Sequence, residues 1–170
     1  MFVGRKQELT TLERLYRSDA FQMPVVYGRR RVGKTSLIAE FVKGKPVIFF
    51  SARESTAKEN LVALSQAIAD LRLDGTSVAS DTAAPVFASF EEAFTHVFTL
   101  AQQQRIVLVI DEFPYLAQSD RSVSSVLQHL IDHHKENSRL FLILCGSSMS
   151  FMEHQVLCYK SSLYGRRTAQ

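Results

Sequence analysis

The chain has 170 residues, of which 46% are hydrophobic and 22% charged, with a formal net charge of +3. This composition is typical of one soluble globular domain and excludes a disordered or fibrous protein. Cys145 and Cys158 are the only cysteines, which excludes a disulfide framework or a thiolate metal site. No apolar run reaches the roughly 20 residues of a membrane span, and the start is charged and amphipathic rather than a signal sequence, so we expect a cytoplasmic protein.

Helical and strand patterns alternate along the chain. Apolar residues at helical spacing and short apolar runs predict these elements. The predicted helices cover residues 5–18, 34–43, 58–71, 90–104 and 122–135. The predicted strands cover residues 24–27, 46–50, 106–110 and 140–145. Residues 74–89, which are rich in Ser, Thr, Ala and Asp, predict a loop, and residues 113–115 are expected to turn the chain out of the third strand.

The predicted strands are continuous apolar runs, as in strands that are buried on both faces. Alternation with helices then favours the α/β class, as a three-layer αβα sandwich around a mostly parallel sheet. Ligands of such sheets bind at the carboxyl ends of the strands.

The octapeptide GRRRVGKT, from Gly28 to Thr35, follows the first strand and opens the next helix. It fits the phosphate-binding P-loop pattern G-x-x-x-x-G-K-[ST]. Gly28 and Gly33 let successive amides form a concave nest for anionic oxygens, to which the helix adds its free N–H groups. Lys34 would reach the β- and γ-phosphates, and Thr35 would offer a hydroxyl to Mg²⁺. The other expected contacts come from Arg29, Arg30, Arg31, Val32 and Ser36.

Asp111 and Glu112 directly follow the apolar run IVLVI. An aspartate at such a strand end can hold magnesium, and the adjacent glutamate can orient and polarise the attacking water. An apolar strand that ends in an acid is the Walker B arrangement. The alternative interpretation is that the acid only caps the start of a helix or turn. The glutamate favours hydrolysis, and the absence of an N-K-x-D segment makes adenine a better choice than guanine, so the predicted ligands are ATP and Mg²⁺.

Three further features allow two interpretations each. Ser147 follows the fourth strand, where it is either a sensor of the γ-phosphate or part of a Gly-Ser turn. The basic cluster of Arg29, Arg30 and Arg31 would attract phosphate, contact another copy of the chain or bind along a nucleic acid. The alternative is that these side chains are only solvated surface charges. His129 and His133 have a spacing that a metal can use, but the sequence offers no further ligand set, so surface histidines are favoured.

Five segments, in order, resemble the archaeal-type ATPase family, a branch of the AAA+/STAND P-loop ATPases. They are Phe2-Val3-Gly4-Arg5 with Glu8-Leu9 following, GRRRVGKTSL, IVLVIDEFPYL, LILCGSSMSFM and Ser162 to Thr168. The resemblance covers essentially the whole chain and implies one P-loop ATPase domain over residues 1–170, of the ASCE/AAA+ type.

The resemblance also implies residue roles. The segment Phe2–Arg5 is expected near the adenine and ribose, with the phosphates on Gly28–Ser36. Asp111 would serve magnesium with Thr35, Glu112 would be the catalytic base, and Ser147 the sensor, with Ser148 its neighbouring candidate. Arg166 or Arg167 would approach the γ-phosphate, in the same chain or from a neighbour, or else form a surface salt bridge.

Members of the family continue beyond this last segment with another strand, more helices and often winged-helix and nuclease-like parts. We therefore expect the domain to be incomplete after Gln170. The partners implied are ATP and ADP, and a homo-oligomer or C-terminal effector domains, with no membrane. The family and the basic loop also suggest DNA, but the sequence contains no recognisable nucleic-acid-binding module. The predicted function is an Mg-ATP-hydrolysing switch or motor. The alternatives are a regulatory module that binds nucleotide without hydrolysis, and an accessory of a DNA-binding or nuclease protein.

Overall fold

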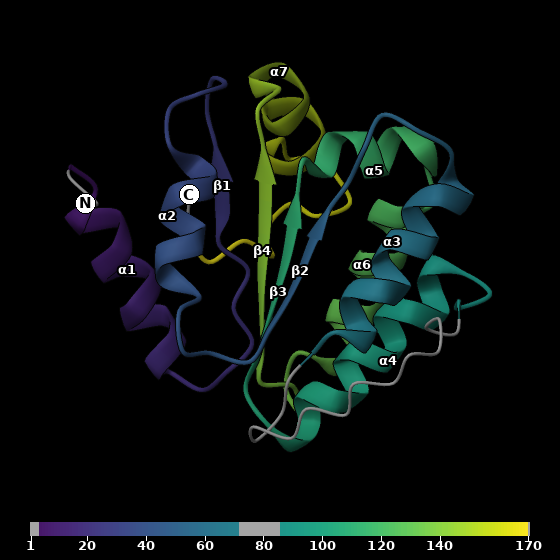
Figure 1. Ribbon diagram of the computed structural model, residues 1–170, viewed down its shortest axis with the longest axis horizontal. Coiled ribbons are helices and arrows are strands. Elements are labelled where there is room, and N and C mark those ends of the chain that lie inside the picture. Colours follow the sequence, from purple (N-terminus) through teal and green to yellow (C-terminus); the bar gives the residue numbers. More distant parts are fainter. Residues whose placement is uncertain (1–3, 72–85, 170) are drawn as a thin grey trace.

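The computed structural model describes residues 4–71 and 86–169. Within them the chain forms a parallel sheet of four strands in the order β1-β4-β3-β2 (Figure 1). The strands are β1 (Val25–Tyr27), β2 (Val47–Ser51), β3 (Ile106–Asp111) and β4 (Leu140–Gly146). Phe2, Val3 and most of the loop expected at 74–89 lie outside the described residues.

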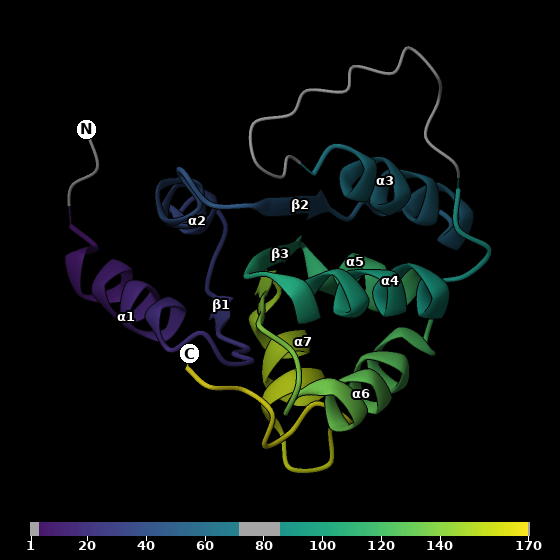
Figure 2. The same cartoon turned by 90° about the horizontal axis from the view of Figure 1, so that it is seen from below.

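Helices cover both faces of the sheet, as the predicted three-layer sandwich requires (Figure 1, Figure 2). One face carries α1 (Lys6–Arg17) and α2 (Lys34–Phe41). The other carries α3 (Ala57–Ala69), α4 (Phe90–Gln103), α5 (Phe113–Ser119) and α6 (Val123–His134), and α7 (Met149–Met152) continues into a π-helical turn over Glu153–Leu157. None of the helices described here is long and apolar enough to cross a membrane.

Side chains of β3 and β4 divide alternately between two cores. Ile106, Leu108 and Ile110 belong to the larger core under α3–α6, whereas Val107 and Val109 face α1 and α2. Successive side chains of a strand point to opposite faces, so Asp111 falls on the same face as Val107 and Val109. The alternation therefore directs Asp111 toward α2, the helix that follows the P-loop.

The second strand is not buried on both faces as its apolar sequence predicts. Ile48 and Phe50 are fully buried, but Val47 and Phe49 are only partly buried. The reason is position, because β2 is an edge strand and its side chains on the α1–α2 face have a neighbouring strand on one side only.

Residues 113–115 begin a helix rather than only turning the chain. Pro114 stands in the first turn of α5, where a missing N–H and a fixed φ do not disturb the helix. Phe113, Leu116 and Ala117 are buried, so this short helix is held by the core rather than by its length.

Thr168 and Ala169 lie beside the outer edge of β1. The Thr168 N–H donates to the Met23 carbonyl at 2.9 Å, and the Val25 N–H donates to the Ala169 carbonyl at 2.8 Å. Pro24 and Ala169 form a parallel bridge. The free edge of β1 thus carries two residues from the end of the described chain.

Replacing Phe98 by alanine should lower the free energy of unfolding by about 3–5 kcal/mol, because the ring is 1% exposed in the larger core and leaves a cavity. Urea unfolding followed by circular dichroism measures the change. Val62→Ala on α3, where the side chain is 44% exposed, is the control and should stay within about 0.5 kcal/mol. Equal losses in both variants would contradict the placement of α4.

Candidate functional site

The carboxyl ends of three strands meet at one edge of the sheet. Tyr27 pairs with Gly146 and Ile110 with Leu144, so the chain segments that follow β1, β3 and β4 leave the sheet side by side. A cleft of about 320 Å³ lies there. Its walls come from three of these segments: Arg30, Arg31, Gly33, Lys34, Thr35, Ser36, Glu112 and Ser147.

The P-loop leads directly into α2. Gly33 has φ 83° and ψ 21°, in the left-handed region that favours glycine, and α2 begins at the next residue. The Lys34 ammonium donates to the carbonyl oxygens of Gly28 and Arg29, both at 2.8 Å. An ammonium has three donors, so this buried cation is positioned by neutral oxygens and keeps a donor for an anion.

The side chains of Asp111 and Thr35 are in contact next to the cleft. Their side-chain oxygens, Oδ2 and Oγ1, are 3.4 Å apart, and the Glu112 N–H donates to the other Asp111 oxygen at 2.9 Å. Hard oxygen ligands of this kind suit Mg²⁺, which commonly takes one or two carboxylates and completes its shell with phosphates and water. Residues 4–71 and 86–169 contain no group of three His, Cys, Asp or Glu side chains that could hold a metal ion.

Glu112 occupies an unusual backbone conformation at the N-terminus of α5. Its φ of 51° and ψ of 45° lie in the left-handed region, which costs a residue with a Cβ about 1–2 kcal/mol. The Ser147 hydroxyl lies 2.9 Å from each carboxylate oxygen and donates to the carboxylate. Backbone strain in non-glycine residues clusters at functional sites, and the carboxylate of this strained residue faces the loop after β4.

Cys145 lies on β4 on the α2 side of the sheet and is fully buried. Burial, together with the nearby Asp111 carboxylate, raises the pKa of its thiol. The thiol therefore stays neutral beside Asp111 and contributes no reactive thiolate.

The three P-loop arginines differ in their surroundings. Arg30 and Arg31 line the cleft, whereas Arg29 is exposed and does not. The Arg30 guanidinium donates to the Tyr115 hydroxyl on α5 at 2.7 Å. The sequence offered no signal for Tyr115 as a site residue, because the contact joins segments 85 residues apart.

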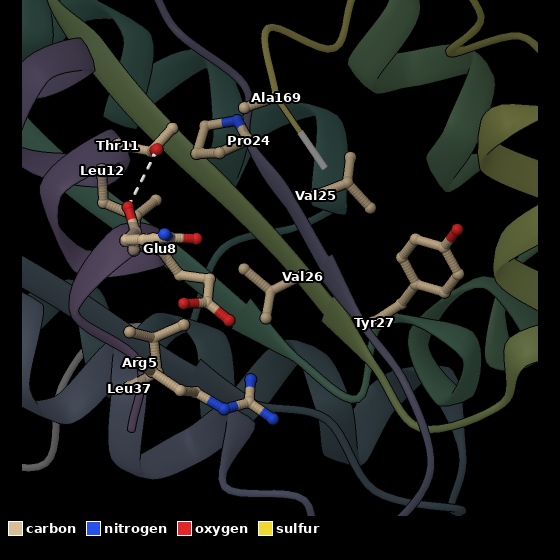
Figure 3. A pocket seen from close by; sticks show the side chains of 11 residues that line it. Arg5, Glu8, Thr11, Leu12, Pro24, Val25, Val26, Tyr27, Leu37 and Ala169 are labelled. Atoms are coloured by element: carbon tan, nitrogen blue, oxygen red, sulfur yellow. Dashed lines mark hydrogen bonds between the residues drawn. The ribbon is translucent and has the colours of Figure 1, made fainter. Parts of the chain in front are cut away.

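The start of α1 reaches the P-loop on its other side. A guanidinium N–H of Arg5 donates to the Val32 carbonyl. A second pocket, of about 440 Å³, lies between α1 and β1, and Figure 3 shows Arg5 and Glu8 on one side of it and Val25, Val26 and Tyr27 on the other. Gly4 and Arg5 are thus near the P-loop, while Phe2 and Val3 lie outside the part of the chain that the structure describes.

Arg166 is not brought to the cleft. Its guanidinium donates to the Asp132 carboxylate on α6 at 2.8 and 2.6 Å, and this contact lowers the pKa of Asp132. Arg167 is exposed and does not line the cleft either. Within one copy of the chain, Arg166 therefore forms the surface salt bridge that was the alternative to a phosphate contact. Arg166 stays at α6 because the Asp132 carboxylate accepts two hydrogen bonds from its planar guanidinium, which is a strong bidentate pairing.

In sequence, the chain is similar to a family of ATPase domains and to an individual archaeal protein. The model of a family described as an ATPase domain predominantly from Archaea matches residues 2–169. An uncharacterised protein of Methanocaldococcus jannaschii is 34% identical over 168 residues, which is 99% of this chain and 34% of that protein. The chain thus spans about a third of the length of this relative.

Solved structures share the fold at lower sequence identity. The Walker-type ATPase of Pyrococcus abyssi superposes with a TM-score of 0.70 at 24% identity, over 97% of this chain and 51% of that one. The Orc1 protein of Aeropyrum pernix, solved in complex with DNA, gives 0.64 at 19% identity, over 99% of this chain and 45% of that one. These likenesses confirm the predicted P-loop ATPase fold.

Gly146→Ala should destabilise the protein by about 1–3 kcal/mol, since an added methyl group overpacks the junction of β4 and Ser147. A Cβ on Gly146 would lie 2.7 Å from Met152 Sδ and 3.0 Å from Pro114 Cδ. Urea unfolding gives the loss. If the clash is the cause, Gly146→Ala and Met152→Ala together cost less than the sum of the two single changes; a strictly additive result would contradict it.

Proposed function

The chain belongs to the family of ATPase domains found predominantly in Archaea, and we propose on that premise that it binds Mg-ATP in the cleft and hydrolyses the γ-phosphate. The observation that carries the proposal is the convergence of Lys34, Thr35, Asp111 and Glu112 on one edge of the sheet. The two halves of this site are 76 residues apart in sequence, and the Thr35–Asp111 contact joins them.

The triphosphate would lie on the P-loop and the N-terminus of α2. Free amides at the start of a helix attract anionic oxygens, and the helix dipole adds to that attraction. Lys34 is held beneath the loop by two carbonyl oxygens, which supports a contact to the β- and γ-phosphates through its remaining donor. Gly28 to Ser36, the whole predicted loop, is the phosphate-binding segment of the proposal.

Thr35 and Asp111 would hold the magnesium ion, because they bring a hydroxyl and a carboxylate oxygen within 3.4 Å of each other beside the cleft. When bound with ATP, magnesium neutralises charge that develops on the transferred phosphoryl group. The hydrogen bond from the Glu112 N–H to Asp111 keeps the carboxylate oriented.

Glu112 would act as the general base for hydrolysis. Its carboxylate lines the cleft and would take a proton from the water that attacks the γ-phosphorus, while the bond to the β-phosphate oxygen breaks and ADP leaves. Ser147 would sense the terminal phosphate, since its hydroxyl lies at the same end of the cleft as Glu112.

The adenine and ribose would enter the pocket between α1 and β1. Leu12, Val25 and Leu37 supply apolar surface there, while Arg5 and Glu8 supply polar groups. A pocket that combines apolar surface with polar groups suits a nucleobase and its ribose. This assignment follows the expectation that the segment from Phe2 to Arg5 lies near the base.

Residues 1–170 are proposed to act as one ATPase domain. The same proposal includes coupling of this domain to effector domains, to other copies of the chain or to DNA. The exposed arginines of the P-loop suit either of two polyanions, a nucleoside triphosphate or DNA. Because Arg30 and Arg31 line the phosphate cleft, nucleotide alone accounts for their placement. A regulatory module that holds ATP without hydrolysing it is the alternative function, and it differs only in the action of Glu112.

Glu112→Gln should reduce the rate of phosphate release from Mg-ATP by about 10²–10⁴-fold, because an amide cannot accept the proton from water. Binding of ATP should remain within a few-fold of the unaltered protein, since the amide still accepts the Ser147 hydrogen bond. Glu136→Gln, at an exposed residue after α6, is the control. Joint loss of binding and turnover in Glu112→Gln would argue against a base, and no phosphate release by the unaltered protein would favour the regulatory module.

Lys34→Ala should weaken ATP binding about 10- to 100-fold, because it removes a charged donor from the phosphates. Titration with a fluorescent ATP analogue measures the dissociation constant. Lys135→Ala, which removes an exposed lysine at the end of α6, is the matched control. Unchanged affinity in Lys34→Ala would show that the nucleotide does not lie on this loop.

A further inference from the structure

Arg30 and Tyr115 join the tip of the P-loop to α5. The Arg30 guanidinium donates to the Tyr115 hydroxyl at 2.7 Å. The tyrosine ring is partly buried and packs against the larger core, so that only its polar end reaches the loop. A core-packed ring is a rigid support, because few rotamers are open to it.

This contact distinguishes Arg30 from its two neighbours. Within residues 4–71 and 86–169, neither Arg29 nor Arg31 donates a side-chain hydrogen bond, although all three arginines are exposed. Long exposed side chains sample many rotamers and lose that freedom when they bind a ligand. Tyr115 restricts Arg30 before any ligand arrives, which lowers the cost of using this arginine for binding.

The chemistry of the partner matters as much as the distance. A phenol is uncharged, so it orients the guanidinium without neutralising it, whereas a carboxylate at this place would form an ion pair. A guanidinium has several N–H donors, and Tyr115 accepts one hydrogen bond from it. The remaining donors and the full positive charge stay available to an anion, and the tyrosine O–H keeps its own proton to donate.

The position of Arg30 in the cleft indicates which anionic group it would contact. Arg30 lines the cleft together with Glu112 and Ser147, the two residues proposed for the γ-phosphate end. Tyr115 is in the first turn of α5, and its N–H donates to the Glu112 carbonyl at 2.9 Å. The same turn thus supports the proposed base and the partner of Arg30.

We propose that Arg30 binds the terminal phosphate of ATP and that Tyr115 is the positioning residue that holds it there. The inference rests on the proposed function. It adds to that function the pair of residues that distinguishes ATP from ADP. Because ADP lacks the γ-phosphate, the Arg30–Tyr115 pair increases the affinity for ATP and leaves the affinity for ADP unchanged.

Tyr115→Phe tests the inference, since it keeps the partly buried ring and removes only the hydroxyl. Equilibrium titrations with Mg²⁺ and either a β,γ-imido analogue of ATP or ADP measure both affinities. We expect the analogue to bind about three- to tenfold more weakly while ADP binding changes by less than about twofold. Tyr159→Phe, at a tyrosine that is 70% exposed and lines neither pocket, is the control.

Arg30→Gln must reproduce the selective loss, and adding Tyr115→Phe to it must have no further effect, because the hydroxyl would then act only through the arginine. Equal weakening of both nucleotides, or an additive double variant, would overturn the positioning role. In either case normal binding by the unaltered protein leaves the proposed function intact. If the unaltered protein binds neither nucleotide, the proposed function fails and this inference fails with it.

Discussion

The parallel register of β1, β4 and β3 is the constraint on which the site depends. It places Tyr27 opposite Gly146 and Ile110 opposite Leu144, so the P-loop, the Glu112 turn and Ser147 emerge at one edge. Every residue of β3 and β4 except Asp111 and Gly146, the last residue of each strand, belongs to a packed core. A slip of one residue would move each apolar side chain to the opposite face and Asp111 away from α2, so burial and site geometry are enforced together.

Charged groups of the site are held by uncharged partners. Lys34 donates to carbonyl oxygens and Arg30 to a phenol, while Asp111 accepts from a main-chain N–H and Glu112 from a hydroxyl. In the part of the chain that the structure covers, no ion pair joins these cations to these acids. The cleft therefore keeps charges of both signs without pairing them to each other, in line with the proposed binding of a nucleotide together with magnesium.

Much of the fold could be predicted from the sequence because its signals are local. Apolar runs and helical spacing located the four strands and most of the helices, and the P-loop and Asp111-Glu112 motifs located the two halves of the cleft. The prediction failed where neighbours decide the outcome. The partial exposure of Phe49 depends on β2 being an edge strand, and α5 is too short for a recognisable period and is held by buried Phe113 and Leu116.

By itself, the sequence determined the fold class, the phosphate loop and the acidic pair, since glycine positions, apolar periodicity and a strand-end carboxylate are properties of adjacent residues. Only the tertiary structure decided the strand order, the Arg30–Tyr115 contact, the hold of Ser147 on Glu112, and the pairing of Arg166 with Asp132. Each of these joins residues more than 30 positions apart. Packing of whole strands and helices sets such distances, and no local pattern records them.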